Sequence, residues 1–374
     1  MAESSPAALR VRVRQEGPIP LDAALECQPG ETLALVGPSG SGKTTLLRCI
    51  AGLRAAKEGR IECGDSIWYD TASGVDEPPH QRAVGFVFQN YALFPHLSAL
   101  GNVAAALGHI AADARPARAR ELLALVHLSG LETRRPAELS GGQQQRVAVA
   151  RALARDPRVL LLDEPFSAVD RVTRQKLYRE LAELRRSTAL PMVLVTHDLD
   201  EAAMLADRMT ILHRGRTLQT GAPRDVMARP VDTLVARLVD LKNVFEGQLD
   251  TTGAGPPGLI WNGRSLELAR APPFAPGSRV AWSVPISGVL LHRRDRPSRG
   301  EHENPVDGIV SEAYEVGDDT MIGMRVSGSP IIVWLRVPTH VAQRNRVMAG
   351  ESIRISLLAN MIHVMPWSPV SIEA

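Results

Sequence analysis

Aromatic residues are scarce in this chain of 374 residues, and none precedes Trp68. Phe, Trp and Tyr together make up 4% of the sequence, and the formal net charge is only +2. Proteins that bind single-stranded nucleic acids combine a positively charged groove with exposed aromatic rings. The composition therefore argues against a nucleic-acid-binding protein, and we expect no nucleic acid among its partners.

Cysteines are also few. Cys27, Cys49 and Cys63 are the only ones, and their spacing does not match that of metal ligands. Three is an odd number, which cannot build a closed disulfide framework. We expect all three to be buried, reduced thiols, as in a cytosolic protein.

Long hydrophobic runs are missing as well. Residues 83–112 contain no Asp, Glu, Lys or Arg, but Gln89, Asn90, Asn102 and Pro95 interrupt them. Polar groups of this kind are costly in the hydrocarbon of a bilayer, so we expect no membrane-spanning helix here. The N-terminal residues also lack the continuous apolar core of a signal peptide.

Short apolar runs alternate with amphipathic stretches over the first two thirds of the chain. The runs TLALVG, RVLLLDEP and PMVLVTHD are typical of strands buried on both faces of a parallel sheet. This order predicts an α/β layered domain over residues 1–240. From residue 244 to 374, short alternating runs separated by Gly, Pro and Asp predict a small all-β barrel or sandwich.

A phosphate-binding loop is the first chemical motif. Residues 37–44 read GPSGSGKT and lie between a predicted strand and a predicted helix, which is the context that the G-x-x-x-x-G-K-[ST] pattern requires. Glycines let backbone N–H groups approach phosphate oxygens, Lys43 supplies a positive charge, and the Thr44 hydroxyl is placed to bind Mg²⁺. The residues that we expect to hold the nucleotide are Gly37, Pro38, Ser39, Gly40, Ser41, Gly42, Lys43, Thr44 and Thr45.

Two further motifs point to catalysis and assembly. The strand VLLLDEP delivers Asp163 and Glu164 at its carboxyl end, which suits Mg²⁺ binding and activation of the attacking water, respectively. Taken alone, the pair is equally consistent with an acidic loop. The run LSGGQQQR places Ser140 at the start of a helix, where free backbone N–H groups make a second phosphate cradle. One nucleotide does not need two cradles on one chain, so the second one would serve a nucleotide bound to another copy.

Together these residues resemble the ATP-binding-cassette (ABC) ATPases of bacterial importers, in the order that the family shows. The resemblance implies a P-loop NTPase fold with a helical subdomain at about residues 90–150, followed by a C-terminal OB-like/TOBE regulatory domain. It implies that Gln89 senses Mg²⁺ and the γ-phosphate and that His197 contacts the γ-phosphate. The catalytic residues would be Glu164, His197 and Gln89, and the Mg²⁺ ligands Thr44, Gln89 and Asp163. Further nucleotide-binding residues would be Ser140, Gly141, Gly142, Gln143 and Asp170. Ser140 and Gly142 would face the phosphate loop of the other copy, and Asp170 would lie in a loop that contacts it.

The resemblance also implies cofactors, partners and location. It implies MgATP as cofactor, a head-to-tail homodimer, two integral-membrane permease subunits and a periplasmic or lipid-anchored solute-binding protein. The dimer would lie peripherally on the cytoplasmic face of the inner membrane. The C-terminal runs NPVDGIV and ESIRISLLANMIHVMP are similar to the OB-like domains of such importers. The strand-rich layout with LRVPTHVAQRNRV favours molybdate as cargo, with sulfate, ferric iron, polyamine or sugar as alternatives. A non-transport cassette ATPase and a ligand-sensing regulator are further alternatives.

The sequence departs from the family at one point. Relatives place an aromatic residue before the phosphate loop, where it stacks on adenine, whereas this chain has none. We therefore expect the base to contact apolar or cationic side chains near Arg12–Pro20, or residues elsewhere.

Overall fold

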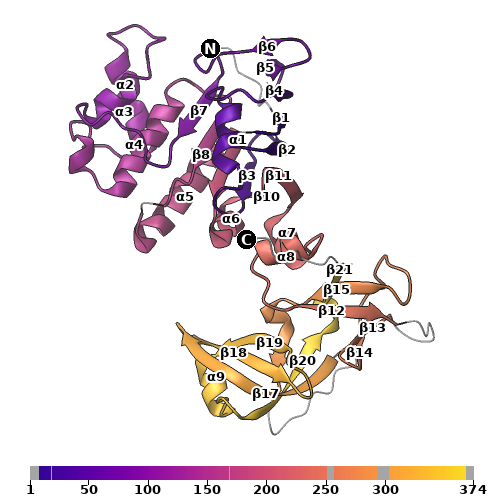
Figure 1. Cartoon of the computed structure of the whole chain (residues 1–374). Helices are drawn as coiled ribbons and strands as arrows, with labels where there is room; N and C mark the ends of the chain where they lie inside the picture. The colour runs from indigo at the N-terminus through magenta and orange to yellow at the C-terminus, as the bar shows by residue number, and fades with distance from the viewer. Residues whose placement is uncertain (1–7, 18, 168, 251–256, 293–302, 368–374) are drawn as a thin grey trace. The chain divides into compact units, whose positions relative to one another are not determined.

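The computed structural model describes all residues except 1–7, 18, 168, 251–256, 293–302 and 368–374 (Figure 1). The chain divides into two units, Met1–Pro223 and Arg224–Ala374. The sequence prediction ended the first domain at residue 240, after helices α7 (Pro223–Ala228) and α8 (Thr233–Leu238). Ala236 of α8 packs against Ala281 and Met365, which explains why this helix belongs to the second unit.

A mixed sheet organises the first unit. Over the described residues its strand order is β6-β5-β4-β1-β2-β11-β10-β3-β9-β8-β7. The strands from β10 to β7 run parallel to one another, as do β11 and β2, and the remaining pairs are antiparallel. The bounds in sheet order are Val75–Asp76, Ser66–Asp70, Glu58–Cys63, Leu9–Gln15, Leu21–Cys27, Arg216–Gly221, Arg208–His213, Thr32–Val36, Met192–Thr196, Val159–Asp163 and Val84–Val87.

The hydrophobic pattern of each strand explains its place. The central strands β3, β8 and β9 are buried at every position, as their continuous apolar runs predict. Strand β1, with the sequence LRVRVRQ, instead alternates buried apolar residues with exposed arginines, because only one of its faces is covered. The α/β prediction for this part of the chain is thus confirmed.

Helices cover the sheet and form a group beyond it. Helices α2, α3 and α4 lie together on the side of β7 (Figure 1), and Val103, Leu122 and Val147 from them share one core with Val87 of β7. Helices α2 and α3 fall within the stretch of about residues 90–150 predicted as a helical subdomain, and α4 extends to Leu153. The bounds are α1 Lys43–Ile50, α2 Ala99–Ala104, α3 Arg115–Leu125, α4 Gly141–Leu153, α5 Arg171–Thr188 and α6 Leu199–Leu205, with a 3₁₀ turn at Pro136–Glu138.

Two five-stranded antiparallel sheets make up most of the second unit, in the orders β14-β13-β12-β15-β21 and β16-β20-β17-β18-β19 over its described residues. Side chains of both sheets share one core, in which Trp261 and Trp282 pack edge to face with ring centroids 5.1 Å apart. This barrel-like architecture confirms the predicted OB-like/TOBE class. The bounds are β12 Val244–Leu249, β13 Gly258–Trp261, β14 Arg264–Glu267, β15 Arg279–Ser283, β16 Val289–Leu291, β17 Glu303–Val316, β18 Asp319–Val326, β19 Ile332–Pro338, α9 Thr339–Arg344, β20 Ser352–Leu358 and β21 His363–Pro366, with 3₁₀ turns at Ile286–Gly288 and Ala359–Met361.

The three cysteines lie inside the first unit. Cys27, Cys49 and Cys63 are free thiols, and each is buried in the core that the sheet shares with α1. Burial raises the pKa of Cys27 to about 12 and that of Cys63 to about 11. The prediction of buried, reduced thiols is confirmed.

Candidate nucleotide site

The phosphate loop joins β3 to α1 and depends on its glycines. Gly40 and Gly42 have φ angles of 80° and 102°, in the left-handed region that favours glycine. A Cβ at Gly37 would lie 2.0 Å from the carbonyl oxygen of Leu212, so only glycine fits there. The loop therefore keeps its backbone open at the N-terminus of α1, where an anion is favoured.

Lys43 lies across this loop. Its Nζ donates hydrogen bonds to the carbonyl oxygens of Gly37 and Pro38, at 2.7 and 2.9 Å. The residue is 5% exposed, and burial lowers the pKa of Lys43, although the nearby carboxylates of Glu164 and Asp163 oppose that change. A buried cation held over a loop of backbone amides suits the phosphates of a nucleotide.

Thr44 and Asp163 meet at the end of the central strands. The Thr44 hydroxyl donates a hydrogen bond of 2.9 Å to Oδ1 of Asp163, which is 4% exposed. Burial raises the pKa of Asp163, while the hydrogen bond from Thr44 lowers it. Hydroxyl and carboxylate oxygens are ligands that Mg²⁺ takes together with phosphate oxygens, so this pair fits the ion.

Glu164 is contacted by both of the other predicted catalytic residues. Nε2 of Gln89 lies 3.3 Å and Nδ1 of His197 3.4 Å from Oε2 of Glu164, and the histidine contact is an ion pair only when His197 is protonated. The three residues follow β7, β9 and β8, which are parallel neighbours. Glu164 itself has a φ of 45°, a strained conformation for a residue with a side chain.

A cavity of about 500 Å³ unites most of these groups. Its lining combines the phosphate loop with Gln89, Glu164 and Ile19. Asp163 and His197 contact two of the residues that line it, Thr44 and Glu164, respectively. Ile19 was not singled out from the sequence, although it falls within the predicted stretch Arg12–Pro20. Its backbone carbonyl accepts a hydrogen bond from the side chain of the buried Gln15.

Comparison with known proteins agrees with this geometry. The sequence profile of the family described as "ABC transporter" matches residues 21–167. A spermidine/putrescine import ATP-binding protein of Pseudomonas fluorescens is 38% identical over 87% of this chain and 87% of its own length. A spermidine/putrescine import ATP-binding protein of Roseobacter denitrificans is 41% identical over 83% of this chain and 84% of its own length. A sulfate/thiosulfate import ATP-binding protein of Xylella fastidiosa is 48% identical over 76% of this chain and 85% of its own length.

This chain belongs to the ABC transporter family. It is an ATP-hydrolysing subunit of the importer type, as the sequence predicted. Among the helices that the structure describes, none has the length and apolar character needed to cross a bilayer.

The signature run of this ABC subunit begins helix α4. Ser140 caps the helix by accepting a hydrogen bond from the Gln143 backbone N–H at 3.3 Å, and the Gln143 side chain accepts one from the Ser140 N–H at 2.8 Å. This reciprocal capping box fixes the exposed helix start, with Gly141 as its first residue. The predicted residues at this helix start lie apart from the lining of the nucleotide cavity of the same chain.

Asp170 stands directly before α5. Its Oδ1 accepts a hydrogen bond of 3.0 Å from the backbone N–H of Thr173, as an N-cap does. Ser167 donates a hydrogen bond of 3.0 Å to the backbone carbonyl of Glu164. The segment that carries Asp170 is thereby tied to the strained residue at the end of β8.

Proposed function

We propose that Glu164 activates the water that attacks the γ-phosphate of MgATP. The observation that carries this proposal is the convergence of Gln89 and His197 on the Glu164 carboxylate, beside the phosphate loop. Phosphoryl transfer needs an oriented nucleophile and stabilised charge more than covalent chemistry. Gln89 would orient the water and His197 would contact the γ-phosphate.

The phosphate loop and its neighbours would bind the nucleotide and its metal ion. Lys43 would pair with the β- and γ-phosphates, and the loop amides would hold them in place. Thr44, Asp163 and Gln89 would bind Mg²⁺, which neutralises charge that develops on the phosphates. The side chain of Ile19 would contact the base, since it is an apolar member of the cavity lining.

The signature residues would complete the site of a second copy. Ser140 and Gly141 lie at the capped N-terminus of α4, where backbone N–H groups favour an anion. Ser140, Gly141, Gly142, Gln143 and Asp170 would thus contact ATP in trans within a head-to-tail homodimer. The proposed assembly adds two membrane-embedded permease subunits and a periplasmic or lipid-anchored solute-binding protein, at the cytoplasmic face of the inner membrane.

The cargo is proposed from the relatives. Those described above are named for polyamine and for sulfate import, so they support two alternatives of the sequence prediction over molybdate. Sulfate is our first candidate, because the sulfate-type relative has the higher identity over a comparable share of its length. A polyamine is the second, because the match to that type extends over more of this chain.

Solute uptake by the native host tests this function. Deletion of the gene should abolish uptake of labelled sulfate, and the wild-type chain but not Lys43→Ala should restore it. If the deleted strain loses only spermidine uptake, the cargo is a polyamine rather than sulfate. If it loses only molybdate uptake, the cargo is molybdate, as the sequence predicted. Normal uptake of all three solutes in the deleted strain would refute the proposed cargo classes.

A further inference from the structure

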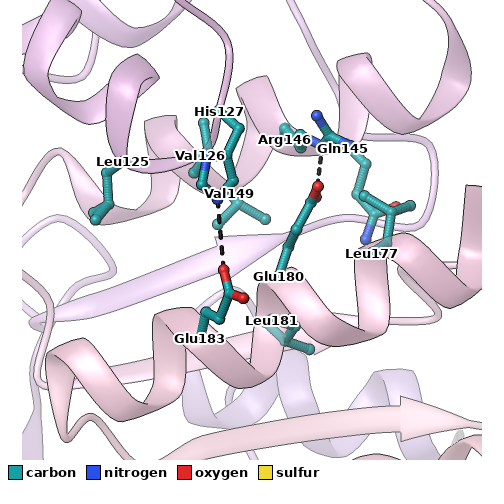
Figure 2. Close-up of a pocket in the computed structure, with 10 residues that line it drawn as sticks. All are labelled: Leu125, Val126, His127, Gln145, Arg146, Val149, Leu177, Glu180, Leu181 and Glu183. Carbon is teal, nitrogen blue, oxygen red and sulfur yellow. Dashed lines mark ion pairs between the residues drawn. The ribbon is translucent and has the colours of Figure 1, made fainter.

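A second cavity, of about 220 Å³, lies in the first unit between helices α4 and α5 and the turn that follows α3 (Figure 2). It shares no lining residue with the nucleotide cavity. Its apolar walls come from three segments, and they are formed by Leu125, Val126, Val149, Leu177 and Leu181. The catalytic mechanism proposed above assigns no role to this space.

The cavity results from the way in which α4 and α5 separate along their length. At Gly142 a Cβ would lie 2.8 Å from Cγ2 of Thr173 and 3.5 Å from Cδ1 of Leu177, so the helices are in close contact there. About one and two turns further along α4, Gln145 and Val149 line open space instead. The glycine thus brings one end of the two helices together, while larger side chains hold the cavity open beyond it.

A buried polar atom points to the kind of ligand that would fit. Gln145 is 5% exposed, and its Oε1 has no hydrogen-bond partner within the described part of the chain. A buried acceptor without a partner is unfavourable, and a ligand that donates a hydrogen bond would relieve that cost. The surrounding walls are apolar, so the rest of such a ligand should be apolar too.

Each carboxylate at the cavity lies beside a basic side chain. Nε of Arg146 lies 2.7 Å from Oε2 of Glu180, and both side chains are largely buried. His127 and Glu183 form an exposed contact of 3.6 Å, which is an ion pair when His127 is protonated (Figure 2). Glu180 lies beside Arg146 and Glu183 is largely exposed to solvent, so the cavity favours a neutral ligand over a cation.

We propose that this cavity binds a small neutral ring compound that carries one hydrogen-bond donor, with the donor on Oε1 of Gln145. An apolar cavity of about 150 Å³ is large enough for benzene, so this one suits a ligand of one or two fused rings. Ser140 caps helix α4, so a bound molecule that restrains α4 against α5 would alter ATP hydrolysis without competing with ATP. That regulatory step rests on the proposed function, whereas binding does not.

Indole and benzothiophene are suitable probes, because they share their shape but only indole has an N–H donor. Each is titrated into the full chain, and methyl NMR signals of the leucines and valines are followed. Indole should shift the signals of Val149, Leu177 and Leu181 and bind about three- to tenfold more tightly than benzothiophene, the range of one hydrogen bond. No shift of these signals up to the solubility limit of indole would overturn the site.

Matched variants separate the two parts of the binding argument. Gln145→Met keeps the length of the side chain and should make the two affinities equal. Leu181→Phe fills the cavity and should abolish binding of both probes, while Leu53→Phe, the same change at an exposed position, should leave it intact. Binding that persists in Leu181→Phe, or a preference for indole that persists in Gln145→Met, would contradict the proposal.

The regulatory step is measured by ATP hydrolysis at saturating indole. We expect kcat to change at least twofold with an unchanged KM for ATP, and the effect to vanish in Leu181→Phe. An unchanged kcat despite demonstrated binding would refute regulation from this cavity. Absence of hydrolysis without indole would contradict the proposed function instead, so the two failures are distinguishable.

Discussion

Glu164 has a strained backbone, and its side chain is contacted by two other residues. Its positive φ is unfavourable for any residue with a Cβ, and Gln89 and His197 both contact Oε2 of its carboxylate. Strain of this kind persists only where the surrounding structure enforces it, and it is concentrated at functional sites. The geometry of this residue therefore serves the orientation of its carboxylate rather than the stability of the fold.

Replacement of Glu164 by Gln tests its role as the base. The amide keeps the shape of the side chain but cannot accept a proton from water, so we expect hydrolysis to slow by on the order of 10²–10⁴ with ATP affinity retained. Phosphate release and binding of a fluorescent ATP analogue measure the two quantities. Glu121→Gln, at an exposed position on α3, is the control and should hydrolyse ATP normally. A normal rate in Glu164→Gln would exclude this residue as the base.

Ile19 offers a second test at this scale. Ile19→Ala removes apolar contact with the base, so we expect affinity for ATP and GTP to fall in parallel, by about three- to tenfold. Ile19→Trp should raise both affinities, because an indole ring can stack on either base. Competition against a fluorescent nucleotide measures all four values. Leu53→Ala is the control, and unchanged affinities in both Ile19 variants would exclude the contact.

Helices and strands could be predicted from the sequence where a single local pattern of residues determines their type and position. The parallel strands follow from continuous apolar runs, and the start of α4 follows from Ser140 and Gln143 as a capping box. The antiparallel part of the sheet was not predicted, although the alternation in LRVRVRQ indicates a strand covered on one face. The meeting of Gln89 and His197 at Glu164 depends on the order of β7, β8 and β9, which no local pattern contains. It was expected only from the family resemblance.

The packing of α4 against α5 is testable at this level. Gly142→Ala gains about 1 kcal/mol in helix propensity but places a methyl group 2.8 Å from Cγ2 of Thr173. Overpacking costs about 1–3 kcal/mol, so we expect a net loss of up to about 2 kcal/mol in the free energy of unfolding. Thermal and urea denaturation measure it.

A second substitution identifies the cause of that loss. Thr173→Ser removes Cγ2 and should restore stability in the double variant with Gly142→Ala. Gly108→Ala adds a methyl group where nothing lies within 4 Å, so it should cause no comparable loss. If the double variant is as unstable as Gly142→Ala alone, the contact with Thr173 is not responsible.

At the scale of the whole molecule, the two units have separate cores and separate architectures. The first contains every residue that we propose for ATP binding and hydrolysis. The two elements proposed to bind phosphate, the loop at α1 and the capped start of α4, belong to different parts of that unit. This arrangement leads to the proposal that a complete site forms only between two copies.

ATP-dependent dimerisation follows from that proposal. The Glu164→Gln variant should be monomeric without nucleotide and should become dimeric with MgATP, because bound ATP then persists between the two copies. Light scattering after gel filtration measures the change in mass. Lys43→Ala should remain monomeric under both conditions, since it lacks the cation that binds the phosphates. A Glu164→Gln variant that stays monomeric at saturating MgATP would refute the shared site.

The reactivity of the buried cysteines can be used to measure local unfolding of the first unit. All three lie in its core, and burial raises the pKa of each thiol, so the folded chain should react slowly with alkylating reagents. The second unit contains no cysteine. The rate of thiol labelling would therefore report transient unfolding of the ATPase unit alone. Mass spectrometry would give this rate for each of the three cysteines. The measurement needs no introduced label site and can be made while the protein hydrolyses ATP.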